Sequence, residues 1–213
     1  MLEAMGDYAL RGLAKGAKVQ TPVGPWQVQD LRVGDLIDTL DEGPLPILWM
    51  GQTELFVAAP AVRIAMGTIA NATPLLLAPD HLVMIDGSDC ELLFGEAEVL
   101  VKASDLVGLP GITYDKQKLQ SSYFHFMLDT HQLIIADGVP VESFHPGLVR
   151  NEEEITELKS LLQDTLEQQD IDAIFAEEPI LYILTENEAA VLRNLRLKLH
   201  GAHQASAGAL SAA

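Results

Sequence analysis

Three side chains have the types and positions that could carry chemistry in this chain: His81, Asp129 and His131. His81 follows Pro79, which bars a helix interior, and precedes the apolar run 82–85. It therefore stands where an irregular segment is predicted to become a buried strand. An imidazole in such a place can accept or donate a proton near neutral pH. The alternative is a core histidine whose ring is hydrogen-bonded to backbone.

Asp129 and His131 are separated by one residue, so in an extended strand they would share one face at roughly 6 to 7 Å. That geometry permits a proton relay or a weak metal site. The alternative is a strand-end aspartate that accepts turn hydrogen bonds beside a solvated histidine. His125 lies roughly 20 Å from His131 along an extended strand, so these two cannot chelate one metal without a bend. His145 is predicted to be a loop residue, and we predict no metal and no other cofactor.

The elements that must position these side chains are short strands. Glycine and proline recur between short apolar or β-branched runs from Gly12 to about Gly147, and the Asp137-Gly138 pair is a hairpin turn signal. At least eight strands and no alternation of strand with helix predict an all-β core. The predicted strands cover residues 18–21, 26–28, 36–40, 45–54, 62–65, 81–85, 98–101, 123–128 and 132–136, with a return strand from 139. Residues 28–34 recur loosely as residues 101–108, which two similar halves or chance would produce.

After Gly147 the pattern becomes helical and acidic. Residues 152–170 are predicted to form one amphipathic helix, and residues 185–200 a second, which begins with a capping box of Thr185 and Glu188. Their apolar stripes are expected to pack on the chain's own sheet. Basic side chains at 193, 196 and 198 suit the C-terminal end of the second helix, and residues 205–213 are expected to fray.

Composition excludes several classes of function. The chain has 213 residues, 48% of them hydrophobic, and a formal charge of -18, which would repel nucleic acid and anionic lipid surfaces. The single cysteine, Cys90, permits no intramolecular disulfide and is expected to be a small buried side chain. Residues 1–10 do not resemble a signal peptide, and no apolar run is long enough to span a membrane. We expect a soluble protein, either cytoplasmic or secreted without an N-terminal signal peptide.

The ordered set of motifs resembles the Hint module, the all-β autoprocessing fold of Hedgehog C-terminal domains and inteins, in its bacterial stand-alone branch. The resemblance rests on Ala78-Pro79-Asp80-His81 and on residues 16–22, 28–36, 91–96, 129–131 and 136–138. It covers residues 12–147 and extends into the tail at 178–189. It implies a pseudo-two-fold β-module, with residues 1–11 as a lead and residues 148–213 as an acidic helical tail with a disordered end.

In active members of that family, a Cys or Ser that opens the module attacks the carbonyl just upstream, and the histidine of a Thr-x-x-His motif assists breakdown of the amide. Here the resemblance places Gly12 at the nucleophile position and Ala78 at the threonine position. The His-Asn pair of inteins falls on Glu142-Ser143. What remains is His81, Asp129 and His131, which the resemblance makes vestigial catalytic candidates.

Two hypotheses follow. The first is a degenerate Hint-fold protein that no longer self-cleaves and acts as a binding or structural module, with an unknown protein partner. The second is an autocatalytic protein-processing domain or hydrolase that uses His81 with Asp129 and His131. The sequence leaves the oligomeric state open.

Overall fold

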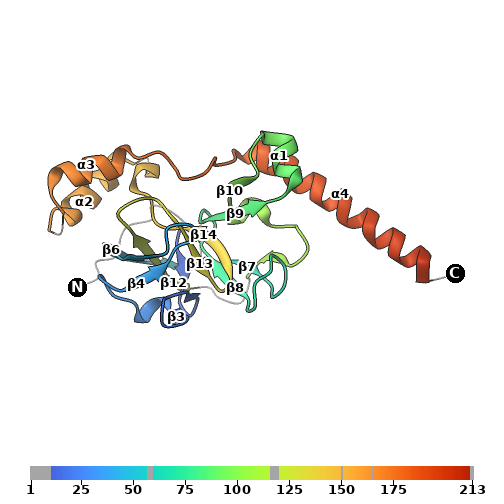
Figure 1. The fold of residues 1–213 in the computed structure, drawn as a ribbon, viewed down its shortest axis with the longest axis horizontal. Coiled ribbons are helices and arrows are strands. Elements are labelled where there is room, and N and C mark those ends of the chain that lie inside the picture. Colours follow the sequence, from blue (N-terminus) through green and yellow to red (C-terminus); the bar gives the residue numbers. More distant parts are fainter. Residues whose placement is uncertain (1–10, 57–59, 116–119, 150, 165, 212–213) are drawn as a thin grey trace.

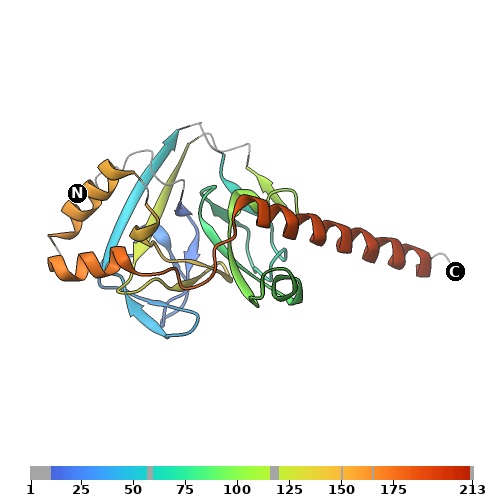
Figure 2. The same cartoon turned by 90° about the horizontal axis from the view of Figure 1, so that it is seen from above.

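The structure is a computed structural model that describes residues 11–56, 60–115, 120–149, 151–164 and 166–211. The predicted lead, residues 1–10, lies outside this part. Most of the described strands belong to two six-stranded sheets, with helices attached at their margins (Figures 1 and 2). The strands are β1 (Leu13–Ala14), β2 (Lys18–Val19), β3 (Trp26–Gln27), β4 (Leu36–Asp38), β5 (Pro44–Pro46), β6 (Trp49–Phe56), β7 (Val62–Ile64), β8 (Leu75–Leu77), β9 (Leu82–Asp86), β10 (Glu98–Lys102), β11 (Ile112–Tyr114), β12 (Gln120–Met127), β13 (Leu133–Ala136) and β14 (Val139–Glu142). The helices are α1 (Ser88–Phe94), α2 (Glu152–Leu162), α3 (Gln168–Ala176) and α4 (Glu186–Ser211), with short 3₁₀ turns η1 (Val28–Asp30), η2 (Ala103–Leu106) and η3 (Pro146–Leu148).

The mainly β prediction is confirmed, with the helices confined to margins and tail. Strands β1, β8 and β11 were not predicted, and the first two of them position the site. Helix α1 was also missed. It is a short insertion between β9 and β10, and it buries the predicted Cys90 completely.

The first sheet has the order β11-β7-β8-β1-β12-β6. Its longest ladder pairs β12 with β6, and β1 is inserted between β8 and β12 through Leu13, which opposes both Leu77 and Phe124. Leu13 is buried with the apolar side chains of both sheets in one core. This insertion places the residue before β1, Gly12, deep inside the molecule.

The second sheet has the order β10-β9-β14-β13-β2-β3, so β3 and β10 are its two edge strands. Each edge strand runs into a 3₁₀ turn, β3 into η1 and β10 into η2, and each turn is followed by a glycine with positive φ, Gly34 at 92° and Gly108 at 102°. These are the two segments whose sequences echo one another. The faint repeat therefore corresponds to a repeated strand-and-turn unit at opposite edges of one sheet.

The predicted single helix over 152–170 is wrong, because the chain forms two helices there, α2 and α3. Asn151 caps α2 by accepting hydrogen bonds from the backbone of Glu153 and Glu154. The break allows both helices to bury apolar side chains in one cluster, which includes Leu158, Leu162, Ile171 and Ile174 together with Met127 and Phe144 of the β-module. This cluster confirms that the first stripe packs on the chain's own β-module.

Helix α4 begins with the predicted capping box, in which Thr185 N–H donates to Glu188 Oε2 at 2.8 Å and Glu188 N–H donates to Thr185 Oγ1 at 3.4 Å. The helix continues to Ser211 instead of ending at 200. Alanines at 202, 205, 207 and 209 favour the extension, whereas Gly201 and Gly208 oppose it. The basic side chains at 193 and 196 therefore lie in mid-helix, and the prediction that they suit the helix end is wrong.

Only the first half of α4 packs on the β-module. Leu192 is 1% exposed, whereas Leu199 is 47% exposed, and the later turns project away from both sheets (Figures 1 and 2). Arg193 donates to the carbonyl of Asp105 in η2, and Arg196 forms an ion pair with Asp89 at the start of α1. No described helix is long and apolar enough to cross a membrane.

Candidate functional site around the Arg11–Gly12 bond

The Arg11–Gly12 peptide bond lies beside His81 because two neighbouring strands hold it there. Gly12 precedes β1, its carbonyl accepts from Ala78 N–H at 3.0 Å, and Ala78 follows β8. The chain then turns, with His81 N–H donating to the Ala78 carbonyl, so that the imidazole faces back toward β1. Gly12 N–H donates to His81 Nδ1 at 3.1 Å. The candidate histidine thus contacts the amide nitrogen of this bond.

This hydrogen bond defines the resting state of His81. Because Nδ1 accepts, the neutral ring carries its proton on Nε2, which is buried without a partner among the described residues. Burial lowers the pKa of His81 well below its usual value, and the nearby His125 and Arg11 lower it further. The nitrogen that faces the amide therefore has no proton to donate.

A buried carboxylate, Glu142, stands at the centre of the site. It accepts from Arg11 Nη1 at 2.9 Å and from Leu82 N–H at 2.9 Å. Its Oε1 lies 3.7 Å from His81 Nδ1, and its Oε2 lies 3.8 Å from His131 Nε2. Burial raises the pKa of Glu142, and the Arg11 charge only partly offsets that effect. Glu142 thus links the two predicted histidines through a charge that the sequence analysis did not assign a role.

His131 and His145 form a stacked pair on the far side of Glu142, with ring centroids 4.7 Å apart. His131 Nδ1 accepts from Ile180 N–H at 3.1 Å, and the Glu177 carboxylate accepts from His131 N–H at 2.9 Å. The Nε2 of His145 lies 3.0 Å from the Glu177 carbonyl, so that nitrogen donates and carries the proton. The pair therefore holds the start of residues 177–184, the segment between α3 and α4 that we call the strap.

Burial also decides the charge of this pair. It lowers the pKa of His131 to about 3, with His145 and then Arg11 as the next causes. The pKa of His145 is lowered by burial, and its contact with the Glu177 backbone acts in the opposite direction. Both rings are thus neutral near pH 7, which allows them to stack.

Asp129 is not part of this arrangement. Residues 128–132 form a bend between β12 and β13, so the premise that Asp129 and His131 lie on one extended strand is wrong. Asp129 is exposed and accepts from Thr130 N–H at 3.0 Å, as the turn alternative expected, whereas His131 is buried and not solvated. The chain turns here because β12 and β13 belong to different sheets.

Two histidines that the sequence analysis did not count as site candidates, His125 and His145, lie close to the site. His145 lies in the loop between β14 and η3, as predicted, but it is 2% exposed and stacks on His131. His125 is also buried, its Nε2 lies 3.2 Å from Thr53 Oγ1, and burial lowers its pKa to about 4. Neither position carried a local signal, because their neighbours come from distant parts of the chain. Among the described residues, no group of three or more His, Cys, Asp or Glu could hold a metal ion.

Gly12 has a conformation that other residues rarely adopt. Its φ is +110°, and an added Cβ would lie 2.9 Å from the backbone oxygen of Phe124. A backbone oxygen held in a β-ladder cannot move aside at low cost. A side chain here would therefore be strained both by the positive φ and by contact with the Phe124 oxygen. The cavity that Arg11, His81 and Glu142 line with their neighbours holds only about 10 Å³, close to the volume that one water needs.

A family model with the description Hint domain matches residues 11–148. This match covers most of the chain, so the chain belongs to the Hint domain family. No curated protein sequence matches the chain at a significant level.

Solved structures similar to this chain include inteins and an intein-like domain. The gp41-1 intein is 13% identical, with a TM-score of 0.40, and the similarity covers 62% of this chain and 97% of the intein. A bacterial intein-like domain from Clostridium thermocellum is 11% identical, with a TM-score of 0.40, 63% of this chain covered and 98% of that domain. The MchDnaB-1 intein is 18% identical, with a TM-score of 0.38, 61% of this chain covered and 98% of the intein.

Proposed function

We propose that this Hint domain no longer cleaves itself and acts as a binding or structural module. The observation that carries the proposal is the backbone of Gly12, which has positive φ and no room for a Cβ. Covalent self-cleavage of this type requires a nucleophilic side chain next to the carbonyl that it attacks. Gly12 offers none, and Ala78 offers no hydroxyl at the family's threonine position.

The electrostatics of the site support the same proposal. Departure of the Gly12 nitrogen would require a proton, yet His81 Nδ1 accepts the Gly12 N–H and burial disfavours the protonated ring. Arg11, on the upstream side of the bond, is held by an ion pair with Glu142. In this proposal the vestigial residues keep structural roles. His81 holds the backbone of Gly12, and His131 holds the backbone of the strap. Asp129 accepts a hydrogen bond within its own turn.

The test is the intact mass of the purified protein over several days at pH 7, with and without hydroxylamine, which traps esters and thioesters. We expect one species near 23.1 kDa in both conditions. A fragment that begins at or near Gly12, or ends near Glu142, would overturn the proposal.

A matched pair of variants tests whether the site lacks only its nucleophile or has also lost the rest of its catalytic arrangement. Gly12→Cys restores a thiol, and Gly12→Ala carries the same Cβ strain without it. We expect both to be less stable than the original protein by about 2 to 4 kcal/mol. We expect Gly12→Cys to show at most weak hydroxylamine-induced loss of residues 1–11, which His81→Ala should abolish.

The alternative is a self-processing domain or hydrolase that uses His81 with Asp129 and His131. The hydrogen bond from Gly12 N–H to His81 Nδ1 favours it, because the histidine still contacts the amide nitrogen. In that case a small amount of cleavage would appear in the unmodified protein without hydroxylamine, and His81→Ala would remove it.

The binding role requires a partner of suitable charge. With 31 acidic and 13 basic residues, the chain is suited to a protein partner with basic side chains and not to nucleic acid or an anionic membrane. We propose that it acts in the cytoplasm or outside the cell.

A further inference from the structure

The two edges of the second sheet are covered differently. On the outer side of β10, Leu100 N–H donates to the Tyr182 carbonyl at 2.8 Å, and Leu184 N–H donates to the Leu100 carbonyl at 2.9 Å. The strap thus pairs with this edge as a short extended segment. Beyond it, Arg193 of α4 donates to the Asp105 carbonyl in η2. One edge unit is therefore covered by an extended segment and a basic side chain of the same chain.

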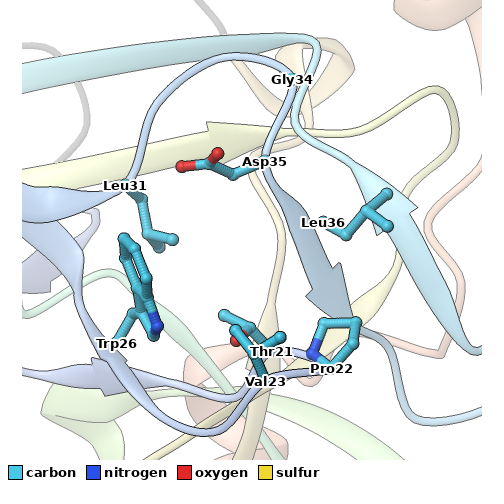
Figure 3. A pocket seen from close by; sticks show the side chains of 8 residues that line it. All are labelled: Thr21, Pro22, Val23, Trp26, Leu31, Gly34, Asp35 and Leu36. Carbon is cyan, nitrogen blue, oxygen red and sulfur yellow. The ribbon is translucent and has the colours of Figure 1, made fainter.

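At the opposite edge, no described segment pairs with the outer side of β3. A pocket of about 260 Å³ opens there, between the turn from β2 to β3 and the loop that follows η1. Its lining is shown in Figure 3: Thr21, Pro22, Val23, Trp26, Leu31, Gly34, Asp35 and Leu36. The floor is the buried Leu31, whereas Trp26 is 45% exposed, Leu36 47% and Val23 81%.

The pocket contains one carboxylate with unused hydrogen-bonding capacity. Asp35 Oδ2 accepts from Arg32 N–H at 2.8 Å, and Figure 3 shows the carboxylate at the rim of the pocket, on the side of Leu31. In the described part of the chain, no cation forms an ion pair with Asp35. The nearby Arg32 guanidinium instead donates to the carbonyls of Gln29 and Leu31. The second oxygen, Oδ1, remains available to a ligand.

The lining matches the chemistry of a lysine side chain. Leu31 and Leu36 offer apolar surface to a methylene stem, the indole of Trp26 can attract a cation through its π face, and Asp35 can accept from an ammonium group. An acidic side chain would be repelled by Asp35, and a neutral donor would gain a hydrogen bond to Asp35 but no ion pair. The net charge of the chain favours approach of a basic partner.

We infer that the β3 edge is a docking site for an extended segment of a partner protein, which inserts a lysine side chain between Trp26 and Asp35. The partner segment pairs with β3 as the strap pairs with β10, because an uncovered edge strand presents free backbone donors and acceptors. The lysine stem lies on Leu31 and Leu36. The site is separate from the Arg11–Gly12 bond, although the inference rests on the binding role proposed above.

The probes are three blocked tripeptides, acetyl-Val-Xaa-Val-amide, in which Xaa is lysine, norleucine or glutamate. Norleucine retains the apolar stem and lacks the charge. Binding is measured from the indole N–H resonances in ¹⁵N spectra, with Trp26 as reporter and Trp49, which lies elsewhere in the fold, as internal reference. We expect the lysine peptide to shift Trp26 saturably, with an affinity roughly five- to tenfold above that of norleucine, and the glutamate peptide not to bind.

Two variants and a control locate the effect. Asp35→Asn retains an acceptor for Arg32 N–H and removes the charge, so it should reduce the preference for lysine over norleucine to the part that Trp26 alone supplies. Trp26→Leu keeps an apolar surface and should weaken the lysine peptide at least threefold, with the shifts of the neighbouring backbone amides as readout. Asp41→Asn removes an exposed acid outside the lining and should change nothing.

The inference is overturned if norleucine binds as tightly as lysine to the original protein, if Asp41→Asn has the effect expected of Asp35→Asn, or if no peptide shifts Trp26. The intact-mass test is independent of these outcomes. A protein that keeps its mass and binds no peptide contradicts the docking site alone, whereas one that cleaves itself and binds lysine contradicts only the lost-cleavage proposal.

Discussion

The β3–η1 and β10–η2 units occupy opposite edges of one sheet and have similar local structure, yet the described part of the chain covers only one of them. The strap and α4 lie against β10 and η2, and Leu192, which is 1% exposed, is buried there. The β3 unit leaves Trp26 45% exposed beside an open pocket. Similar local structure therefore does not imply a similar role. The C-terminal tail covers one edge, and the described residues leave the other open.

The largest expected effect is the loss of the covered edge in acid, because neutral histidines hold the strap. Burial lowers the pKa of His131, which holds the strap, to about 3, and that of His125, which lies inside the β-module beside Thr53, to about 4, whereas in the unfolded chain both take up a proton near 6.5. The stability that these neutral rings contribute is therefore fully present above pH 6.5. It is lost as the pH falls from 6.5 to the folded pKa of each ring. Each histidine contributes about 1.4 kcal/mol per pH unit within its window.

Glu142 acts in the opposite direction, because its raised pKa makes acid favourable to the folded form, but it offsets only one of several histidines. The measurement is urea denaturation between pH 7 and pH 4, with limited proteolysis at the strap. The strap should become susceptible before the β3 unit does. His125→Gln should reduce the slope of the free energy of unfolding against pH by the equivalent of about one proton. A free energy of unfolding that does not change with pH would contradict neutral burial of these rings.

The next largest effect contrasts a leucine at each edge. Leu192→Ala leaves a cavity under α4 and should lower the free energy of unfolding by about 2 to 4 kcal/mol. Leu36→Ala removes an exposed side chain in the open pocket and should change it by less than about 0.5 kcal/mol. Both values come from urea denaturation. Equal losses would mean that the β3 edge is also covered in solution, for instance by a second copy.

A smaller effect is expected from the charged contact that holds α4. Arg196 Nε donates to Asp89 Oδ2 at 2.7 Å, and Nη2 donates to the Asp86 carbonyl at 2.7 Å. Arg196→Gln should cost about 1 to 2 kcal/mol and increase amide exchange in the first turns of α4. The exposed Lys198 is the matched control, and Lys198→Gln should leave both quantities unchanged within about 0.5 kcal/mol.

The smallest effect tests whether the two units are equivalent. Gly34 and Gly108 both have positive φ, and an added Cβ would meet nothing within 4 Å at either position. Alanine at either site should therefore cost only the backbone strain, about 1 to 2 kcal/mol. The two losses should agree within about 0.5 kcal/mol in thermal or urea unfolding. A clear difference would mean that the units share a pattern without sharing a conformation.

Features that depend on local sequence could be predicted. Glycine and proline between short apolar runs indicated the strands of the β-module, and Thr185 with Glu188 indicated the start of α4. The histidine of Ala78-Pro79-Asp80-His81 was identified as the first candidate of the site. The break between α2 and α3 was missed because it is favoured by burial of Ile171 and Ile174 beside Leu158, a contact between helices.

The remainder of the site could not be predicted, because it is assembled from distant segments. Arg11 and Glu142 are 131 residues apart in sequence, and His131 contacts the strap 49 residues further on. Asp129 shows the opposite error. Its spacing from His131 suggested that the two side chains form a pair, but the bend between them separates them. Sequence spacing predicts contacts only within a regular element, and these residues lie where elements end.

The sequence by itself determined that the chain is a mainly β member of the Hint family without a nucleophile at Gly12, because strand patterning, motif order and residue type are local properties. Only the tertiary structure decided what Gly12 can tolerate, because its φ and the nearby Phe124 oxygen depend on the insertion of β1 between β8 and β12. It also decided which sheet edge is covered. That choice depends on where the chain leaves the β-module and on the apolar area that the tail can bury, and neither is written in the residues of the edge strands themselves.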